Sequence, residues 1–176
     1  MLDEHIIRDF SNRIYSKAQF LEELKTYNEQ GFNVYIGTDS KIIKSKIAIV
    51  SAICFHKPGA SGTSGKIFYI KEKINRKQYA SLRARMLLEA YRSIEIAMEL
   101  ENLFSNKLEV HLDVGDTIRS KTAAYETELQ SLVISQGYSC VIKPFSWAGS
   151  AAADRIVKGI RNESKRKRRF AQETTD

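Results

Sequence analysis

The spacing of hydrophobic positions predicts an N-terminal helix followed by three strands. Apolar residues recur at helical intervals within 16–30, where Ser16 can cap the start and Gly31 can end the helix. Runs rich in β-branched and aromatic residues then predict strands over 32–38, 47–55 and 66–74. The Gly- and Ser-rich segment 57–65 separates the last two runs, so we expect these strands to pair as an antiparallel hairpin.

The second half of the chain alternates helical and strand patterns. The predicted elements are a helix over 78–104, a strand over 108–114, a helix over 122–135, a strand over 138–143, and a helix that starts near Gly149 or Ser150. This order predicts an α/β fold in which three leading antiparallel strands are followed by parallel βαβα units. We therefore expect a five-stranded mixed sheet with helices on both faces, plus the N-terminal helix.

Length and composition favour one globular domain with a basic C-terminal end. The chain has 176 residues and is 43% hydrophobic, which suits a single folded domain of roughly 100–200 residues. We expect this domain to cover 1–162, with 1–31 as a helical extension, and 163–176 to be a disordered tail. The formal net charge is +7, and the segment 155–169 carries eight basic residues against one acid. That segment accounts for the whole net charge, so the remainder is neutral.

The basic segment predicts contact with nucleic acid through the phosphate backbone. Candidate contacts are Arg155 and Lys158 in the last helix, Lys41 after the first strand, and the run Lys165, Arg166, Lys167, Arg168 and Arg169. A solubilising tail, or a nuclear signal by composition, is the alternative interpretation of the run.

Cysteine usage and hydropathy point to a cytoplasmic protein. The two cysteines, Cys54 and Cys140, lie in apolar strand-like runs, which favours free thiols in a reducing compartment over a disulfide. The first ten residues carry three acids and no long apolar run, unlike a secretory signal. No apolar run approaches the roughly 18 residues that a membrane-spanning helix needs.

Four carboxylates occupy positions where a folded domain does not usually place acids. Asp39 follows the apolar part of the first strand, and Asp113 lies within the strand 108–114. On a helical wheel Glu89 lies about 20° from Leu82 within an apolar stripe, whereas Glu95 and Glu99 lie about 140° and 100° away, as solvated acids would. A second apolar face, formed by Leu87, Leu88, Tyr91 and Ile94, leaves open which face of this helix meets the sheet.

The fourth acid, Asp154, directly follows three alanines early in the last helix. Each of the four also has an ordinary interpretation, as a turn residue, a strand-end acid or an exposed helix charge. If the first and fourth strands are parallel neighbours, Asp39 and Asp113 face the same end of the sheet. Acids gathered in this way are stabilised by a hard cation such as Mg²⁺ or Mn²⁺, and two such ions can act on one phosphodiester.

The chain resembles the ribonuclease H-like superfamily in its element order and in the elements that carry these acids. The segments YIGTDSK (35–41), VHLDVG (110–115) and KPFSWAGSAAADR (143–155) are similar to the uncharacterised bacterial YkuK-type branch. The resemblance implies that Asp39 and Asp113 are shared ligands of two Mg²⁺ or Mn²⁺ ions, with Glu89 on one ion and Asp154 on the other. It also implies hydrolysis of phosphodiester bonds in RNA, RNA/DNA hybrid, or branched or single-stranded DNA, without a small-molecule cofactor or a membrane partner.

Three further residues near these acids are candidate accessory groups. His111 is two residues from Asp113, Asp116 follows in the next loop, and Trp147 precedes the last helix, where it could stack on a base or pack in the core. Many ribonuclease H enzymes place a histidine shortly before the last acid, whereas no histidine follows His111 here. This departure, and the lack of a basic insertion between the first two helices, argue against strong hybrid-specific cleavage. A non-catalytic nucleic-acid-binding or partner-binding module on the same fold is the alternative function.

Overall fold

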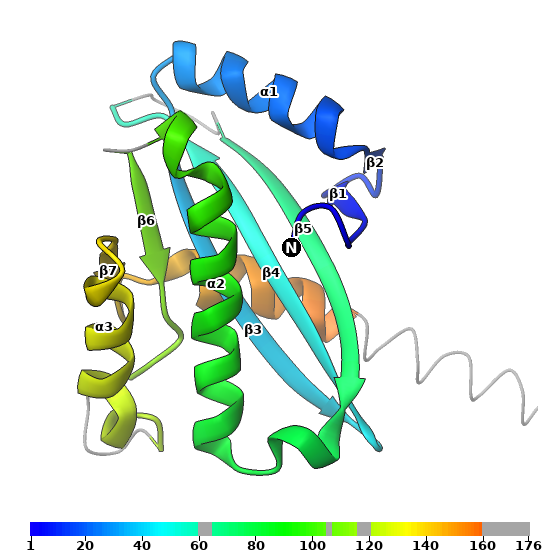
Figure 1. The fold of residues 1–176 in the computed structure, drawn as a ribbon, viewed down its shortest axis with the longest axis vertical. Helices are drawn as coiled ribbons and strands as arrows, with labels where there is room; N and C mark the ends of the chain where they lie inside the picture. The colour runs from blue at the N-terminus through cyan, green and yellow to red at the C-terminus, as the bar shows by residue number, and fades with distance from the viewer. Residues whose placement is uncertain (60–64, 105–106, 116–120, 160–176) are drawn as a thin grey trace, which may run out of the picture.

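The computed structural model describes residues 1–59, 65–104, 107–115 and 121–159. Within these residues one mixed sheet of seven strands forms the centre of the molecule, in the order β2-β1-β5-β4-β3-β6-β7 (Figure 1). The strands are β1 (Ile7–Asp9), β2 (Ile14–Tyr15), β3 (Asn33–Ile43), β4 (Lys46–His56), β5 (Gly65–Asn75), β6 (Leu108–His111) and β7 (Ser139–Val141). The α/β class and the mixed sheet are as predicted, with two strands more than the predicted five.

The two additional strands, β1 and β2, lie along the outer edge of β5. They are three and two residues long, too short to show an alternating pattern in the sequence. β1 pairs antiparallel with β5, and its Ile7 side chain is fully buried. The N-terminal segment therefore covers an edge that would otherwise expose unpaired backbone groups.

The three long strands form the predicted antiparallel meander. β3 pairs with β4 from Asn33 opposite His56 to Ile43 opposite Lys46, and β4 pairs with β5 over its whole length. Because β3 continues to the two-residue turn at 44–45, it runs five residues beyond its predicted end at 38. Asp39 consequently lies within a strand, not at its C-terminal end as the sequence suggested.

The predicted parallel arrangement of the later strands is confirmed. β6 pairs parallel with β3, and β7 pairs parallel with β6. β6 ends at His111 and not at 114, so Asp113 lies two residues past the strand and not inside it. The backbone at Leu112 still donates to the Val141 carbonyl at 2.9 Å, which keeps this segment beside β7 after it has left β3.

Helices cover both faces of the sheet, as predicted (Figure 1). Apolar side chains of three helices pack on one face: α1 (Lys17–Glu29), α2 (Leu82–Phe104) and α3 (Glu126–Ser135). The last helix packs on the other face; it begins as the π-helical segment η3 (Ala148–Ala153) and stays helical to residue 159. Short 3-10 segments, η1 (Arg76–Tyr79) and η2 (Ala123–Tyr125), precede α2 and α3.

The helix starts follow from local sequence. Ser16 caps α1 with a capping box, since its hydroxyl accepts from the Gln19 backbone while the Gln19 side chain accepts from the Ser16 backbone.

Cys54 and Cys140 are both free, as expected. Among the described helices, none has the length and apolar character that crossing a membrane requires. The predicted tail over 163–176 lies outside the described residues.

Candidate functional site

The candidate site lies where β3 loses its neighbour β6. Gly37 opposite His111 is the last pair between these strands, while β3 itself continues for six more residues. Asp39 therefore lies on an open stretch of strand edge, with β4 on its other side. Asp113 follows His111 by two residues, so parallel pairing brings both acids to the same end of β6.

Two glycines bring the last helix against this edge. A Cβ atom on Gly37 would lie 2.2 Å from the backbone nitrogen of Gly149, and one on Gly149 would lie 3.1 Å from the His111 carbonyl oxygen and 3.8 Å from the Asp113 Cβ. The backbones of β3, of the segment after β6 and of η3 thus approach more closely than side chains would permit. Asp154 directly follows η3, and π-helical turns of this kind are rare and often found at functional sites.

Glu89 reaches the site from the opposite face of the sheet, on α2. One helical turn further on, the Ser93 hydroxyl donates to Thr38 Oγ1 at 2.9 Å, and Thr38 in turn donates to Ser51 at 2.9 Å. These buried hydroxyls fix α2 against β3 and β4, and they leave Glu89 beside Ser40. The predicted orientation of Glu89 within the apolar stripe is the one observed.

Two of the four carboxylates, Asp39 and Glu89, have raised pKa values. Burial raises the pKa of Asp39 to about 6, and the charges of Asp113 and Asp154 contribute to the rise. Burial also raises the pKa of Glu89 to about 8, with Asp39 and Asp113 adding to the effect, while the Ser40 hydroxyl and Arg85 partly offset it. Acids from β3, α2, the segment after β6 and the last helix therefore meet at one place.

Lysines neutralise the two more exposed acids. Lys143 Nζ lies 2.6 Å from Asp113 Oδ1, and Lys158 contacts Asp154 one turn along the same helix. The Asp113 and Asp154 side chains are 23% and 25% exposed. Among the described residues, no three Asp, Glu, His or Cys side chains are oriented so that they could hold one metal ion. Each of these two carboxylates is paired with a lysine ammonium group, which offsets the repulsion between neighbouring acids.

Comparison with known proteins identifies the family of the chain. A family model described as "Ribonuclease H-like" matches residues 17–158. The chain belongs to the ribonuclease H-like family. A search of curated proteins and a search of solved structures each gave no match. The matched range runs from the start of α1 to Lys158, so it includes all four carboxylates, whereas the narrower resemblance to the YkuK-type branch stays a prediction.

In this ribonuclease H-like chain, His111 is a support for the last helix. It is 1% exposed, its Nδ1 accepts a hydrogen bond from the Ala148 backbone at 3.1 Å, and its Nε2 contacts Glu109 at 2.8 Å. Burial lowers its pKa, which favours the neutral ring that this pairing requires. Trp147 packs against the His111 and Tyr35 rings at 5.7 and 5.1 Å and stays 37% exposed. Asp116 lies outside the described residues.

Only three of the residues predicted to contact nucleic acid, Lys41, Arg155 and Lys158, lie in the part of the chain that the structure describes. Lys41 is half-buried on β3, where its charge offsets a small part of the rise in the pKa of Asp39 that burial causes. Arg155 is exposed, with its guanidinium carbon 5.8 Å from the centre of the Phe10 ring, and Lys158 is engaged by Asp154. The residues 165–169 lie outside the described residues.

Several residues that shape the site were not indicated by sequence. Gly37 and Gly149 carried no turn signal, and the contact between Lys143 and Asp113 joins residues 30 positions apart. Glu99 also differs from expectation: it is not solvated, because the N-terminal amine lies 2.6 Å from its carboxylate and Lys17 lies 3.2 Å away. The wheel and strand patterns singled out the individual acids, but neither their convergence nor their counter-charges could be derived from the sequence.

Proposed function

We propose that this protein is a metal-dependent nuclease that hydrolyses phosphodiester bonds in RNA, RNA/DNA hybrid or structured DNA. The observation that supports it is the convergence of four carboxylates from four elements, where burial and the neighbouring acids raise the pKa of Asp39 and of Glu89. Such a cluster is favourable only when positive charge binds it. Two free cysteines fit a reducing compartment, so we place the activity in the cytoplasm.

The donor set fits Mg²⁺ or Mn²⁺, because hard divalent cations select carboxylate oxygens. We propose that Asp39 and Asp113 hold two ions together, with Glu89 on one ion and Asp154 on the other. When bound, such ions lower the pKa of water and neutralise charge on the phosphate under attack. The chain's own residues contribute positions: Gly37 and Gly149 bring the acids together, and His111 holds the start of the last helix.

The lysines beside Asp113 and Asp154 have a place in this proposal. Lys143 and Lys158 supply positive charge while no cation is bound, and both have side chains that are about half exposed. A cation held by the acids would let the Lys143 ammonium group turn toward a substrate phosphate. This exchange of partners accounts for a carboxylate arrangement that fits metal chemistry although the side chains face lysines.

The test is Mn²⁺- or Mg²⁺-dependent cleavage by the wild type and by Asp39→Asn and Asp113→Asn. RNA, hybrid, single-stranded and branched DNA are the substrates, and each variant is expected to lose cleavage by roughly 10³-fold, since several kcal/mol of charge stabilisation is removed. Glu95→Gln is the matched control, because Glu95 lies on α2 but pairs with Arg92. Wild-type protein that cleaves none of these substrates with either metal contradicts the proposal, as does equal loss in the control.

A non-catalytic nucleic-acid-binding module is the second candidate, favoured by the lysine pairing of Asp113 and Asp154. In that case binding would be equal in EDTA and in Mg²⁺, and no substrate would be cleaved. Binding by the full chain and by a chain lacking 163–176, measured in both conditions, separates the two functions. Metal-enhanced binding together with cleavage supports the nuclease.

A further inference from the structure

A cavity lined by basic residues lies at the tip of the β3–β4 hairpin, away from the carboxylates. It has a volume of about 530 Å³, within the range of roughly 300–1,000 Å³ that is typical of ligand sites. Four basic residues and three small or polar ones line it: Lys44, Lys46, Arg76, Lys77, Ser45, Asn75 and Ala80. We name it the hairpin pocket.

Backbone hydrogen bonds hold the hairpin pocket together. The Arg76 backbone donates to the Ser45 carbonyl at 3.0 Å, which ties the start of η1 to the hairpin turn. The Asn75 side chain accepts from the Lys77 backbone at 3.1 Å, and Asn75 pairs with Lys46 at the end of the β4–β5 ladder. The four cations are therefore carried on a fixed frame and not on a loose loop.

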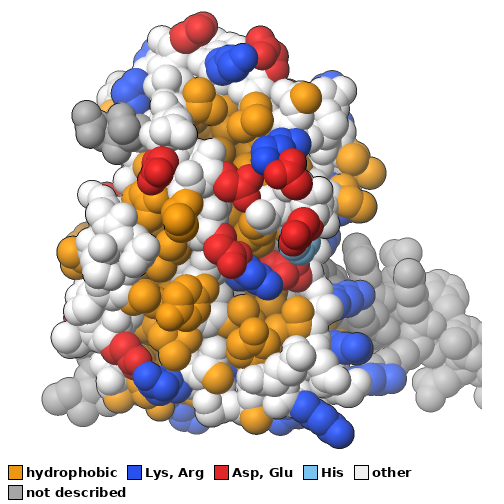
Figure 2. Space-filling model, viewed as in Figure 1, with side chains coloured by type: hydrophobic (Ala, Val, Ile, Leu, Met, Phe, Trp, Pro, Cys, Tyr) orange, Lys and Arg blue, Asp and Glu red, His pale blue; other side chains and the backbone are white. Residues whose placement is uncertain are grey.

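The charges of the hairpin pocket are not balanced by acids. No acidic residue lines it, and in the part of the chain that the structure describes no salt bridge holds any of its four cations. Figure 2 shows basic side chains along the lower right edge, where Figure 1 places the hairpin, whereas acidic side chains with a few basic ones among them lie over the middle of the same face. Cations this close repel each other, and an anion would relieve that repulsion.

The backbone at Lys44 gives an independent indication. Its φ of 58° lies in the left-handed region, which glycine adopts without cost and which costs other residues on the order of 1 kcal/mol. Asn, Asp or Gly would suit this turn position better. A lysine here sacrifices stability to place an ammonium group at the tip of the hairpin, as functional residues in strained turns do.

The geometry points to the hairpin pocket as a second binding site for a nucleic-acid phosphate backbone, additional to the carboxylate site. The choice of nucleic acid as the anion rests on the proposed function. Asp39 and Lys41 lie on β3 and Lys44 lies in the turn directly after it, and five residues of extended chain span about 17 Å. One bound strand can therefore contact Lys41 and the hairpin pocket while it reaches the carboxylates.

The test measures binding by the full-length protein in EDTA, so that no cleavage occurs. The probes are a fluorescent 20-nucleotide single strand and the matching duplex, and the variant is the pair Lys44→Gly and Lys46→Thr. We expect binding to weaken roughly tenfold near 0.15 M salt, and the slope of log affinity against log salt to fall by about 1.5, as two lost phosphate contacts predict. The glycine removes the positive-φ cost, so thermal stability should not fall.

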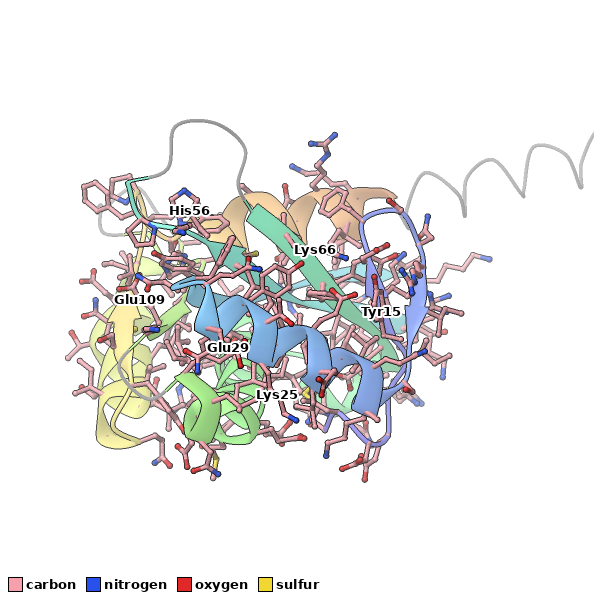
Figure 3. All side chains as sticks on the ribbon, turned by 90° about the horizontal axis from the view of Figure 1, so that it is seen from above. Tyr15, Lys25, Glu29, His56, Lys66 and Glu109 are labelled. Carbon is pink, nitrogen blue, oxygen red and sulfur yellow. The ribbon has the colours of Figure 1, made fainter. Side chains whose placement is uncertain are left out.

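The matched control removes two lysines elsewhere, by Lys25→Gln and Lys57→Gln. Figure 3, which views the end opposite the hairpin turn, shows Lys25 on α1 and shows His56, the residue before Lys57. This pair changes the net charge equally and should alter affinity less than twofold. Equal weakening by both pairs, or no weakening by the hairpin pair, overturns the inference.

Two further outcomes keep this inference separate from the proposed function. Hairpin-dependent binding to vesicles of anionic lipid that is as strong as to nucleic acid would assign the pocket to membranes and overturn it. If Asp39→Asn loses cleavage and the hairpin pair weakens binding as expected, both the nuclease proposal and the hairpin-pocket inference are supported. A wild type that never cleaves, but whose binding depends on Lys44 and Lys46, removes the nuclease and keeps the pocket.

Discussion

Helix α2 contributes to two acidic clusters that differ in their counter-charges. Glu72 on β5 is buried, yet Arg92 of α2 contacts both of its carboxylate oxygens at 3.1 Å, and His5 lies 3.5 Å away. Glu89, one turn earlier on the same helix, instead faces Asp39 and Asp113, and its pKa rises to about 8. An acid enclosed by a guanidinium is satisfied within the fold, whereas Lys41 and Arg85 only partly offset the burial and the acidic neighbours of Asp39 and Glu89.

Gly37→Ala should lower the free energy of unfolding most among the changes considered, and it should move Asp154, in the last helix, away from Asp39. The new Cβ would lie 2.2 Å from the Gly149 backbone, so the last helix must move away from β3. We expect a loss of at least about 3 kcal/mol of unfolding free energy and loss of any Mn²⁺-induced stabilisation, both measured by denaturant unfolding.

Gly159→Ala is the control for this change. A Cβ at Gly159, in the same last helix, would meet no atom within 4 Å, and alanine favours helix. Its stability should stay within about 1 kcal/mol of the wild type. If Gly37→Ala lowers the free energy of unfolding by no more than Gly159→Ala does, η3 does not approach β3 as closely as inferred.

Arg92→Met should have the next largest effect, because it leaves the buried Glu72 unpaired. We expect a loss of about 2–3 kcal/mol, below the range for fully buried pairs since the Arg92 side chain is 24% exposed. Adding Glu72→Gln should recover more than half of this loss in a thermal or denaturant titration. Arg83→Met, which breaks a surface pair with Glu128, should cost less than about 1 kcal/mol. A double variant no better than Arg92→Met would show that the charge of Glu72 is not the cause.

Asp39→Asn should change the free energy of unfolding least, and it should raise this free energy, whereas Gly37→Ala and Arg92→Met lower it. The folded pKa of Asp39, about 6, is above the ordinary value of 3.8, so the folded state binds more protons between pH 4 and 6. Stability therefore decreases as pH rises through this window, and Glu89 extends the decrease toward pH 8. At pH 8 without metal the variant should be more stable by on the order of 1–2 kcal/mol, which raises Tm by a few degrees.

Bound metal should make the wild type, and not Asp39→Asn, the more stable of the two proteins at pH 8. Because metal ligands must be deprotonated, Mn²⁺ should raise the Tm of the wild type more at pH 8 than at pH 5, and should raise that of Asp39→Asn little at either pH. Glu22→Gln is the control, since Glu22 pairs with Lys25 on the surface of α1. If Asp39→Asn is less stable than the wild type at pH 8 without metal, the repulsion inferred for these acids is contradicted.

The extent of correct prediction from sequence varied with the range of the interactions involved. The capping box at Ser16, the three long strands of the meander and the wheel position of Glu89 depend on neighbours a few residues apart, and all were predictable. β1 and β2 were missed because strands of three and two residues carry no periodicity. The end of β3 was placed too early because Asp39-Ser40-Lys41 resembles a turn, whereas pairing with β4 keeps it extended.

The sequence by itself determined which elements carry the four acids and the order of those elements. Their meeting was decided by tertiary structure: parallel pairing that stops at Gly37 and His111, and glycine contacts that let the last helix approach β3. The choice of counter-charge was also tertiary, since Arg92 reaches Glu72 from a different element and Lys143 reaches Asp113 across 30 residues. Local periodicity shows which way a side chain points, but the charge it meets depends on chain segments that only folding brings together.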